Sequence, residues 1–285
     1  MISSSQVVQI GEVARSALER NGGIGVPLAG FVDAPYLEAD KEIIWVGTSL
    51  PAFHPRAVLV SSTPPRGVSI RFERLPARGW SPRRLILDSL NASGLKGATA
   101  ALCTALLRGA APLGFGPLLA RQAPGFPLDL AMPLVRALEE AYRRDDPDAI
   151  FAASIALLGI GAGLTPSGDD LAGGALFGHR FVAPRDQAFH GIAGRLSAEV
   201  AVRSSSISAA LFRDLAEGRS FSPLHDLVAA LARGEHGAAL VAGRGLVRVG
   251  GSSGWDMFAG LMIGLTGGVL QTDPEPRLAS IQTHR

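Results

Sequence analysis

The sequence predicts an α+β protein in which an N-terminal, mainly antiparallel β region precedes a larger, mostly α-helical region. Three observations predict it. Short β-branched runs separated by proline and glycine turns precede residue 76, helical periods of apolar residues follow Trp80, and a glycine-rich helix start occurs twice in the second part. We expect a helix and a β-sheet over residues 1–79, a helical region carrying the glycine-rich motifs over residues 80–271, and a polar tail over residues 272–285.

The predicted β region opens with a helix. Residues 6–20 repeat apolar side chains at helical spacing and end before an Asn-Gly-Gly turn, which is typical of an amphipathic helix. The β-branched runs at 43–46, 57–60 and 68–72 then predict the strands of an antiparallel sheet. His54 lies beside a proline between two of these strands, so we expect it at the surface.

Helical patterns follow in order along the second part. Ser81 and Pro82 have the residue types of a helix start, and a second helix is predicted from Gly94 to Arg108. Residues 110–127 are too rich in proline and glycine for a regular element, so we expect a loop. Apolar stripes predict further helices at 130–144, 148–158, 186–202, 207–217, 223–233 and 235–247.

The densest concentration of glycines, hydroxyls and carboxylates lies at residues 159–178. Gly161 and Gly163 belong to a predicted loop that leads into a helix beginning near Gly168. Ser167 and Asp170 are three residues apart, the spacing of a capping box in carboxylate form. This stretch is therefore predicted to be a glycine loop followed by a capped helix.

The same pattern occurs a second time. Residues 253–264 align without gaps on residues 167–178 and match at Ser, Gly, Asp, Gly and Gly. Two such helix starts, if brought together, would direct backbone N–H groups and positive dipole ends at one point and bind a small anion. Two capped helices that pack through their glycines would also explain the pattern. The adjacent pair Asp169 and Asp170 favours a functional site, because capping needs only one carboxylate.

The candidate site residues gather around these two copies. Arg203 and the serines after it would place a guanidinium and hydroxyls before another helix, which suits a carboxylate or phosphate; one of the serines is explained by capping alone. The candidate catalytic residues are Asp169, Asp170 and Asp256, and the candidate substrate- or anion-binding residues are Gly161, Gly163, Thr165, Ser167, Gly168, Arg203, Ser204, Ser205, Ser252, Ser253 and Gly254. The carboxylates have three possible roles: capping, holding a divalent cation, or acting as bases and orienting groups.

Composition and spacing exclude several classes of function. The net charge of +2 is spread without runs of basic residues, so we expect no nucleic-acid partner. The longest apolar run is shorter than a membrane span and the N-terminus has no signal pattern, which predicts a cytoplasmic protein without membrane contact. The single cysteine and scattered histidines have no metal-ligand spacing, so we predict no metal site and no cofactor, while Mg²⁺ bridging to a substrate phosphate stays open.

With these motifs in view, the chain resembles a known family. The Gly-x-Gly-x-Gly-Leu-Thr-Pro-Ser-Gly-Asp-Asp stretch at 159–170, the serine-rich segment before Leu211 and the Gly-x-Ser-Ser-Gly-x-Asp stretch at 250–256 are similar to the AllH-type subunit of oxamate carbamoyltransferase, formerly a domain of unknown function. The resemblance implies transfer of a carbamoyl group between oxalurate and phosphate in anaerobic purine (allantoin) catabolism, together with two other kinds of subunit. The motif residues carried over are Thr165, Ser167, Gly168, Asp169, Asp170, Ser253, Gly254 and Asp256.

The expected partners follow from this resemblance. They are a small anionic substrate (phosphate, carbamoyl phosphate or a carboxamide acid) and either other carbamoyltransferase subunits or further copies of the chain. We expect Asp170 and Asp256 to position the helix starts, Asp169 to contact the transferred amide, and Arg203 or Arg248 to hold the anion. Two other functions stay open. Ser-Gly-Asp-Asp-Leu-Ala-Gly-Gly also resembles the anion hole of ribokinase-like or other phosphate-binding small-molecule kinases, and the chain would also fit a non-catalytic docking subunit.

Overall fold

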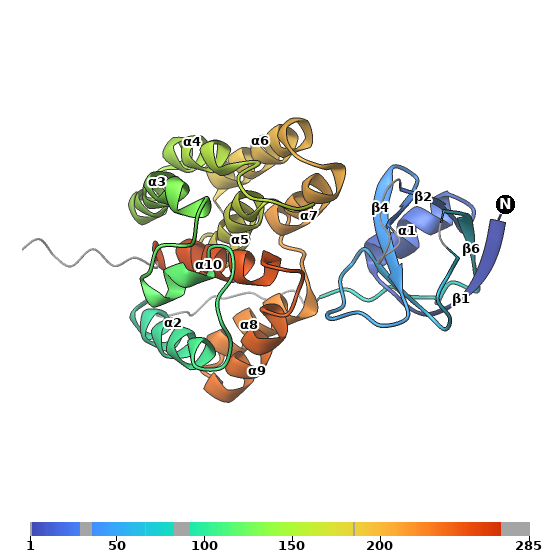
Figure 1. Ribbon diagram of the computed structural model, residues 1–285, viewed down its shortest axis with the longest axis horizontal. Helices are drawn as coiled ribbons and strands as arrows, with labels where there is room; N and C mark the ends of the chain where they lie inside the picture. The colour runs from blue at the N-terminus through green and yellow to red at the C-terminus, as the bar shows by residue number, and fades with distance from the viewer. Residues whose placement is uncertain (1, 29–35, 66, 83–91, 185, 269–285) are drawn as a thin grey trace, which may run out of the picture.

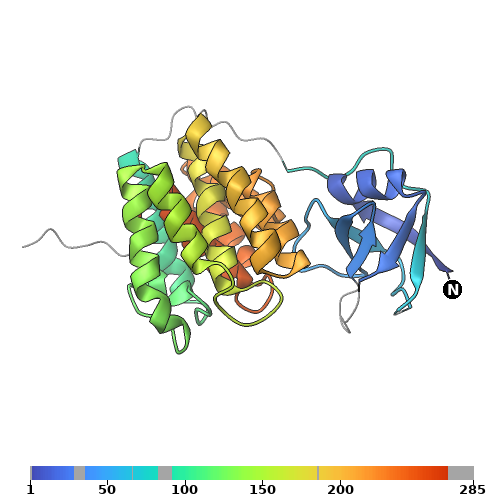
Figure 2. The same ribbon diagram turned by 90° about the horizontal axis from the view of Figure 1, so that it is seen from above.

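The computed structural model describes residues 2–28, 36–65, 67–82, 92–184 and 186–268. A small N-terminal part built on strands lies at one end of the molecule, and a larger helical part forms the rest (Figures 1 and 2). The predicted α+β class is therefore confirmed. Within the described ranges, no helix has the length and apolar character needed to cross a membrane.

Six strands of the N-terminal part close into a barrel. Their order around it is β1-β5-β4-β3-β2-β6. Most neighbouring strands pair antiparallel, as expected for a mainly antiparallel region, but β1 pairs parallel with β6 and β4 pairs parallel with β5. The strands are β1 (Ile2–Ile10), β2 (Ile24–Pro27), β3 (Tyr36–Ala39), β4 (Glu42–Gly47), β5 (Ala57–Val60) and β6 (Ser69–Glu73).

The predicted opening helix is wrong in its first half. Residues Ile2–Ile10 form β1, and helix α1 covers only Glu12–Arg20, which packs Ala14, Ala17 and Leu18 into the barrel core. β1 pairs with β5 on one side and with β6 on the other, so it closes the barrel. These two rows of strand pairing override the helical spacing of the apolar residues in this stretch.

The helical part contains the predicted helices with small shifts in their ends. The Pro/Gly-rich loop carries the 3₁₀ turn η1, and the helix predicted after Ser81 and Pro82 falls on residues outside the described part, as does the polar tail. The bounds are α2 (Ala92–Leu107), η1 (Gly116–Ala120), η2 (Leu128–Ala131), α3 (Met132–Arg144), α4 (Pro147–Leu157), α5 (Ser167–Val182), α6 (Gln187–Arg203), α7 (Ser206–Ala216), α8 (Ser222–Ala232), α9 (His236–Leu246) and α10 (Ser253–Thr266).

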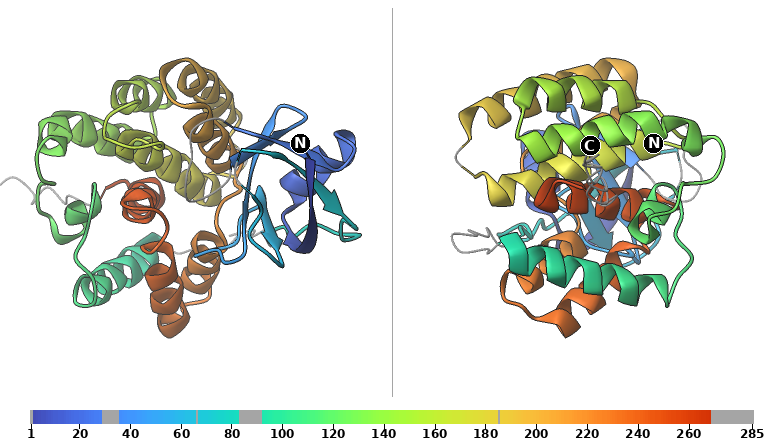
Figure 3. Two further views of the ribbon diagram at one scale, coloured as in Figure 1. Left: turned by 45° about the vertical axis from the view of Figure 1, so that its right-hand side comes forward. Right: turned by 90° about the vertical axis from the view of Figure 1, so that its left-hand side faces the viewer.

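Helices α5 and α10, which begin with the two copies of the motif, are the centre of this part (Figure 3). They run parallel, and glycines allow their backbones to touch. A Cβ atom on Gly260 would lie 2.0 Å from the carbonyl oxygen of Leu171, and one on Gly174 would lie 2.5 Å from that of Met257. These two contacts occupy equivalent positions in the aligned copies. The repeat is therefore a structural repeat, and it places both helix starts side by side.

Candidate functional site

A cavity of about 700 Å³ lies between the barrel and the two helix starts. The helical part contributes the loops before α5 and α10 with the first turns of these helices, one side of α7, and the segment before α8. The barrel contributes Tyr36 on β3, the end of β4, and the loops after β4 and β5. The lining residues are Tyr36, Trp45, Val46, Gly47, Thr48, Ser49, Leu50, Pro51, Ala52, His54, Thr63, Pro64, Ala162, Gly163, Leu164, Thr165, Asp170, Leu211, Leu215, Ser220, Phe221, Val249, Gly250, Gly251, Ser252, Ser253 and Met257.

Hydroxyl groups join the two helix starts across their interface. Thr165 Oγ1 lies 2.8 Å from Ser253 Oγ, and Ser167 Oγ lies 3.3 Å from Ser252 Oγ. Each pair also hydrogen-bonds to one carboxyl group, since Thr165 and Ser253 bond to Asp170 while Ser167 and Ser252 bond to Asp256. In each pair, therefore, one hydroxyl comes from the first copy of the motif and the other from the second.

The capping box predicted for Ser167 and Asp170 is wrong, because the Ser167 hydroxyl bonds to the other copy of the motif. The residue preceding α5 is Pro166, which makes no side-chain cap, and Ser167 is the first residue of the helix. The Gly168 N–H donates to the carbonyl of Ile160 at 2.8 Å, and the Gly254 N–H donates to that of Val249 at 3.0 Å. Backbone carbonyls therefore cap these two N–H groups, and the hydroxyls are used between the copies.

Asp170 is the carboxyl group that lines the cavity. Its side chain is buried, and its Oδ2 has no hydrogen-bond partner within the described part of the chain. Burial raises the pKa of Asp170 well above its ordinary value, and the nearby Asp256 and Asp169 charges raise it further, against the hydrogen bonds from Ser253 and Thr165. This environment favours the neutral, protonated form.

Asp256 occupies the equivalent position in α10 but lies outside the cavity lining. It is completely buried, and its Oδ1 accepts a hydrogen bond of 2.6 Å from the backbone N–H of Phe115. Burial raises the pKa of Asp256 to about 6. Gly114, at φ +56°, approaches so closely that a Cβ atom there would lie 2.2 Å from Oδ1. Asp256 therefore connects α10 to the loop that precedes η1.

Asp169 also lies outside the cavity lining, and three protein groups saturate its carboxylate. The Gly159 N–H donates to Oδ1 at 2.7 Å, while the hydroxyls of Ser204 and Ser208 donate to Oδ2 at 2.5 and 2.6 Å. Ser205 caps α7 through the N–H of Ser208. These contacts hold the break between α6 and α7 against the glycine loop, whereas Asp169 was expected to contact the transferred amide.

The predicted arginines are not at the cavity. Arg203 pairs with Glu199 one turn earlier on α6 at 2.9 Å, and its side chain is half exposed. None of the described residues that line the cavity is a lysine or an arginine, and Arg248 is exposed elsewhere. Of the predicted site residues, the cavity brings together Gly163, Thr165, Asp170, Ser252 and Ser253, whereas Gly161, Ser167, Gly168, Asp169, Arg203, Ser204, Ser205, Gly254 and Asp256 are not among its lining residues.

The barrel supplies an aromatic wall that the motifs do not indicate. The Trp45 ring lies 4.6 Å from His54 and 5.9 Å from Phe221, between ring centroids. The expected surface position of His54 is wrong, because its proline turn packs on the start of α8, where the Ser222 N–H donates to Phe53 O at 2.8 Å. Burial lowers the pKa of His54 to about 3, which keeps the ring neutral.

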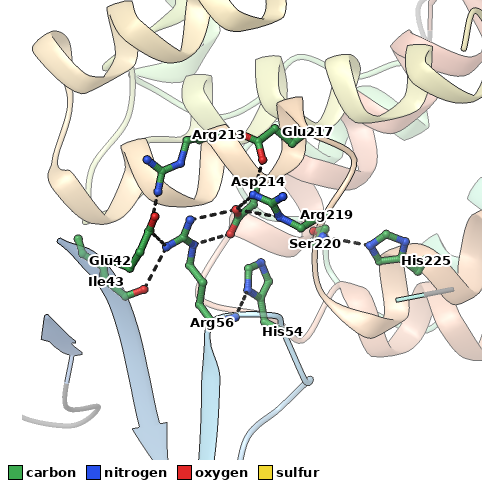
Figure 4. A network of polar contacts seen from close by, with 10 residues as sticks. All are labelled: Glu42, Ile43, His54, Arg56, Arg213, Asp214, Glu217, Arg219, Ser220 and His225. Carbon is green, nitrogen blue, oxygen red and sulfur yellow. Dashed lines mark hydrogen bonds and ion pairs between the residues drawn. The ribbon is translucent and has the colours of Figure 1, made fainter. Parts of the chain in front are cut away.

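A buried network of charges holds this wall against the helices (Figure 4). The Arg56 guanidinium donates to both carboxylate oxygens of Asp214 on α7, at 2.5 and 3.0 Å, and to Glu42 on β4 at 2.6 Å. Arg219 also donates to Asp214 at 2.9 Å. Burial alone would raise the pKa of Asp214, but the charges and hydrogen bonds of Arg56 lower it below the ordinary value. Arg56 and Asp214 are 158 residues apart, so no sequence pattern joins them.

The comparisons with known proteins agree with the motifs. No curated protein and no solved structure matches the chain. The matched family is described as oxamate carbamoyltransferase subunit AllH, and the matched segment extends from the last residue of α4 into α10. It contains both helix starts and every helical loop that lines the cavity. Over residues 157–265, the resemblance to the family of oxamate carbamoyltransferase subunit AllH is therefore confirmed.

Proposed function

We propose that this chain is a subunit of an oxamate carbamoyltransferase-like enzyme, and that the cavity binds a small carboxamide acid such as oxalurate or oxamate. One observation carries the proposal. The segment that matches the AllH family is the segment that builds the polar wall of the cavity, including Thr165, Asp170 and Ser253.

The chemistry of the cavity suits a carboxamide. Its polar wall offers hydroxyls and a buried carboxyl group in an environment that favours the neutral form, and these groups donate and accept hydrogen bonds as an amide requires. The opposite wall carries the rings of Tyr36 and Trp45, which suits a flat, conjugated acid. A negative charge would be met by the two parallel helix starts, because the described lining has no basic side chain.

The reaction implied by the family assigns a task to each of these groups. A phosphate oxygen attacks the ureido carbonyl carbon of oxalurate, a C–O bond forms, and the C–N bond to the oxamate nitrogen breaks. The oxamate nitrogen takes up one proton, which the protonated Asp170 carboxyl would supply, and the proton that hydrogen phosphate loses would restore Asp170. The positive dipole ends of α5 and α10 would stabilise the oxyanion of the tetrahedral intermediate. The reverse reaction returns the proton to Asp170. This chemistry requires no organic cofactor.

Other subunits belong to the proposal. Among the described residues, the cavity lining has no lysine or arginine to neutralise both phosphate and a carboxylate, so a second chain would complete the charge balance. The AllH description, which names a subunit, supports an assembly with other carbamoyltransferase chains.

Ligand binding by the purified chain tests this proposal. Thermal unfolding is measured with oxamate, carbamoyl phosphate, phosphate and ATP, each with and without Mg²⁺. We expect oxamate or carbamoyl phosphate to raise Tm in the wild type and not in Asp170→Asn, while Asp148→Asn, at an exposed position on α4, keeps the response. Stabilisation by ATP with Mg²⁺ alone would favour the kinase function. No response to any compound, together with co-purifying subunits, would favour the docking role.

A further inference from the structure

A second cluster of chemically competent side chains lies towards the other end of α5 from the cavity. It consists of Asp145, His179 and Asp186, and one donor atom from each residue lies within 4.8 Å of the other two. Asp145 is the C-cap of α3, His179 is in the last turns of α5, and Asp186 is the N-cap of α6. Three helices therefore direct these groups to one point.

His179 provides the independent sign of a ligand. The residue is only 6% exposed, and its Nε2 has no hydrogen-bond partner within the described part of the chain. Nε2 lies 3.4 Å from Oδ1 of Asp145, beyond good hydrogen-bond distance. The imidazole also hydrogen-bonds to the backbone of Gly264, and since Nε2 is unpartnered, this bond uses Nδ1. A histidine that binds a metal is commonly held in this way, with one nitrogen bonded to a backbone carbonyl and the other free.

The surroundings fix the ring and leave carboxylate oxygens available. The His179 ring lies 5.4 Å from Tyr142 and 4.4 Å from Phe189, between ring centroids. Oδ1 of Asp186 accepts the capping hydrogen bond of the Phe189 N–H at 3.1 Å, so its Oδ2 can face an ion.

We propose that Asp145, His179 and Asp186 form a binding site for a divalent transition-metal ion of the Zn²⁺ or Mn²⁺ class. One imidazole nitrogen with two carboxylate oxygens suits such an ion, and water would complete the coordination. Bonds of about 2.1 Å place donor atoms about 3–4 Å apart, so the cluster must contract by about 1 Å. The Asp145 side chain is 66% exposed, which permits this movement and opens a path for the ion.

The ion would act as a clamp on the helical part. His179 follows Asp170 by nine residues on α5, about 13 Å along the axis, so the site is separate from the cavity. It would tie the end of α3, the end of α5 and the start of α6 together, and no step of the proposed reaction requires it. The sequence predicts no metal site here, because the three residues lie on separate predicted elements without metal-ligand spacing.

Metal titration of the chelator-treated, full-length chain tests the proposal. Zn²⁺, Mn²⁺ and Ca²⁺ are added separately, with binding measured by calorimetry and stability by thermal unfolding. We expect Zn²⁺ to bind one ion per chain, to raise Tm, and to shift the Nε2 resonance of His179. That resonance separates ligation by the imidazole from binding to the two carboxylates alone.

The variant Asp145→Asn/Asp186→Asn should bind Zn²⁺ about 100-fold more weakly or worse, since loss of an outer-sphere partner alone costs 10–100-fold. Asparagine tolerates the left-handed backbone of residue 145 and caps helices well, so the variant should fold, as far-UV circular dichroism would verify. The matched control, Asp146→Asn/Asp148→Asn, changes exposed carboxylates at the start of α4 and should bind as the wild type does. The proposal is overturned if no saturable binding occurs, if the first variant binds normally, or if the His179 resonance does not move.

Discussion

The two walls of the cavity are held by different kinds of contact. The helical wall depends on direct backbone contact between α5 and α10, through Gly174 and Gly260, and the carboxyl groups there are in environments that favour protonation. The barrel wall depends on a buried, ionised pair, Arg56 with Asp214. The first wall is thus fixed by shape and the second by charge. Changes of volume should damage one wall, and changes of charge the other.

The largest effect on stability is expected from Gly260→Ala. The new Cβ atom would lie 2.0 Å from the Leu171 carbonyl oxygen, so α5 and α10 must separate. We expect a loss of more than about 4 kcal/mol in the free energy of unfolding, at or above the upper end for overpacking. Gly194→Ala on α6 is the control, because nothing lies within 4 Å of its Cβ position, and it should be neutral or slightly stabilising. Equal stability of the two variants in denaturant unfolding would contradict the backbone packing.

The charge-held wall is tested by Arg56→Met. Asp214 is fully buried and would keep only its partner Arg219, so we expect a loss of about 3–4 kcal/mol in the free energy of unfolding. The exposed pair Arg233 and Glu235 provides the control, and Arg233→Met should leave the free energy of unfolding nearly unchanged. If both substitutions cost the same, the buried pair does not hold the barrel wall.

The dependence of stability on pH should differ between the walls. The folded-state pKa of Asp256 is about 6, above the ordinary value of 3.8. The unfolded chain therefore loses this proton first, and stability falls between about pH 4 and pH 6 by up to about 3 kcal/mol. Asp256→Asn removes this loss, so its stability advantage over the wild type should grow from pH 4 to pH 6 and then stay constant. Chemical denaturation at several pH values measures this advantage. An advantage that does not change with pH would refute the raised pKa of Asp256.

For Asp214 in the barrel wall, the change of stability with pH should have the opposite sign. Its pKa is lowered in the folded state, so its contribution is present above the ordinary pKa and is lost as pH falls below it. Comparing the free energy of unfolding of Asp214→Asn with that of the wild type across acidic pH would reveal this loss. The stability difference between them should shrink towards low pH.

The largest effect on function is expected from Asp170→Asn. An amide replaces a carboxyl group whose pKa is raised by burial, so this variant, like Asp256→Asn, should be at least as stable as the wild type near neutral pH. Carbamoyl transfer in the assembled enzyme should be lost, because the amide cannot donate the required proton. Asp169→Asn should retain ligand binding, since Asp169 does not line the cavity. Equal activity of Asp170→Asn and the wild type would remove Asp170 from the mechanism.

Much of the fold could be predicted from the sequence, because apolar periodicity reports which face of an element is buried. Apolar periodicity predicted the wrong element for part of Ile2–Ile10, where pairing with β5 and β6 decides the conformation. The repeat also predicted two equivalent helix starts, and the bond between Thr165 and Ser253 joins them.

The role of each carboxylate could not be predicted in the same way. Asp169 and Asp170 are adjacent, and only their angular difference of about 100° around α5 sends one towards Ser204 and the other to the cavity. That angle has meaning only once neighbouring helices are in place. The pairing of Arg56 with Asp214 depends likewise on how the barrel docks, which no local pattern encodes.

Only one wall of the cavity belongs to the segment that resembles the AllH family. The polar wall lies within residues 157–265, whereas the loops after β4 and β5 come from sequence before it. Surface loops accept substitutions and changes of length more readily than packed helices do. A related chain that kept the helix pair and altered those loops would retain its reacting groups while admitting a different acid. Reactivity and substrate selection can therefore diverge independently in this architecture.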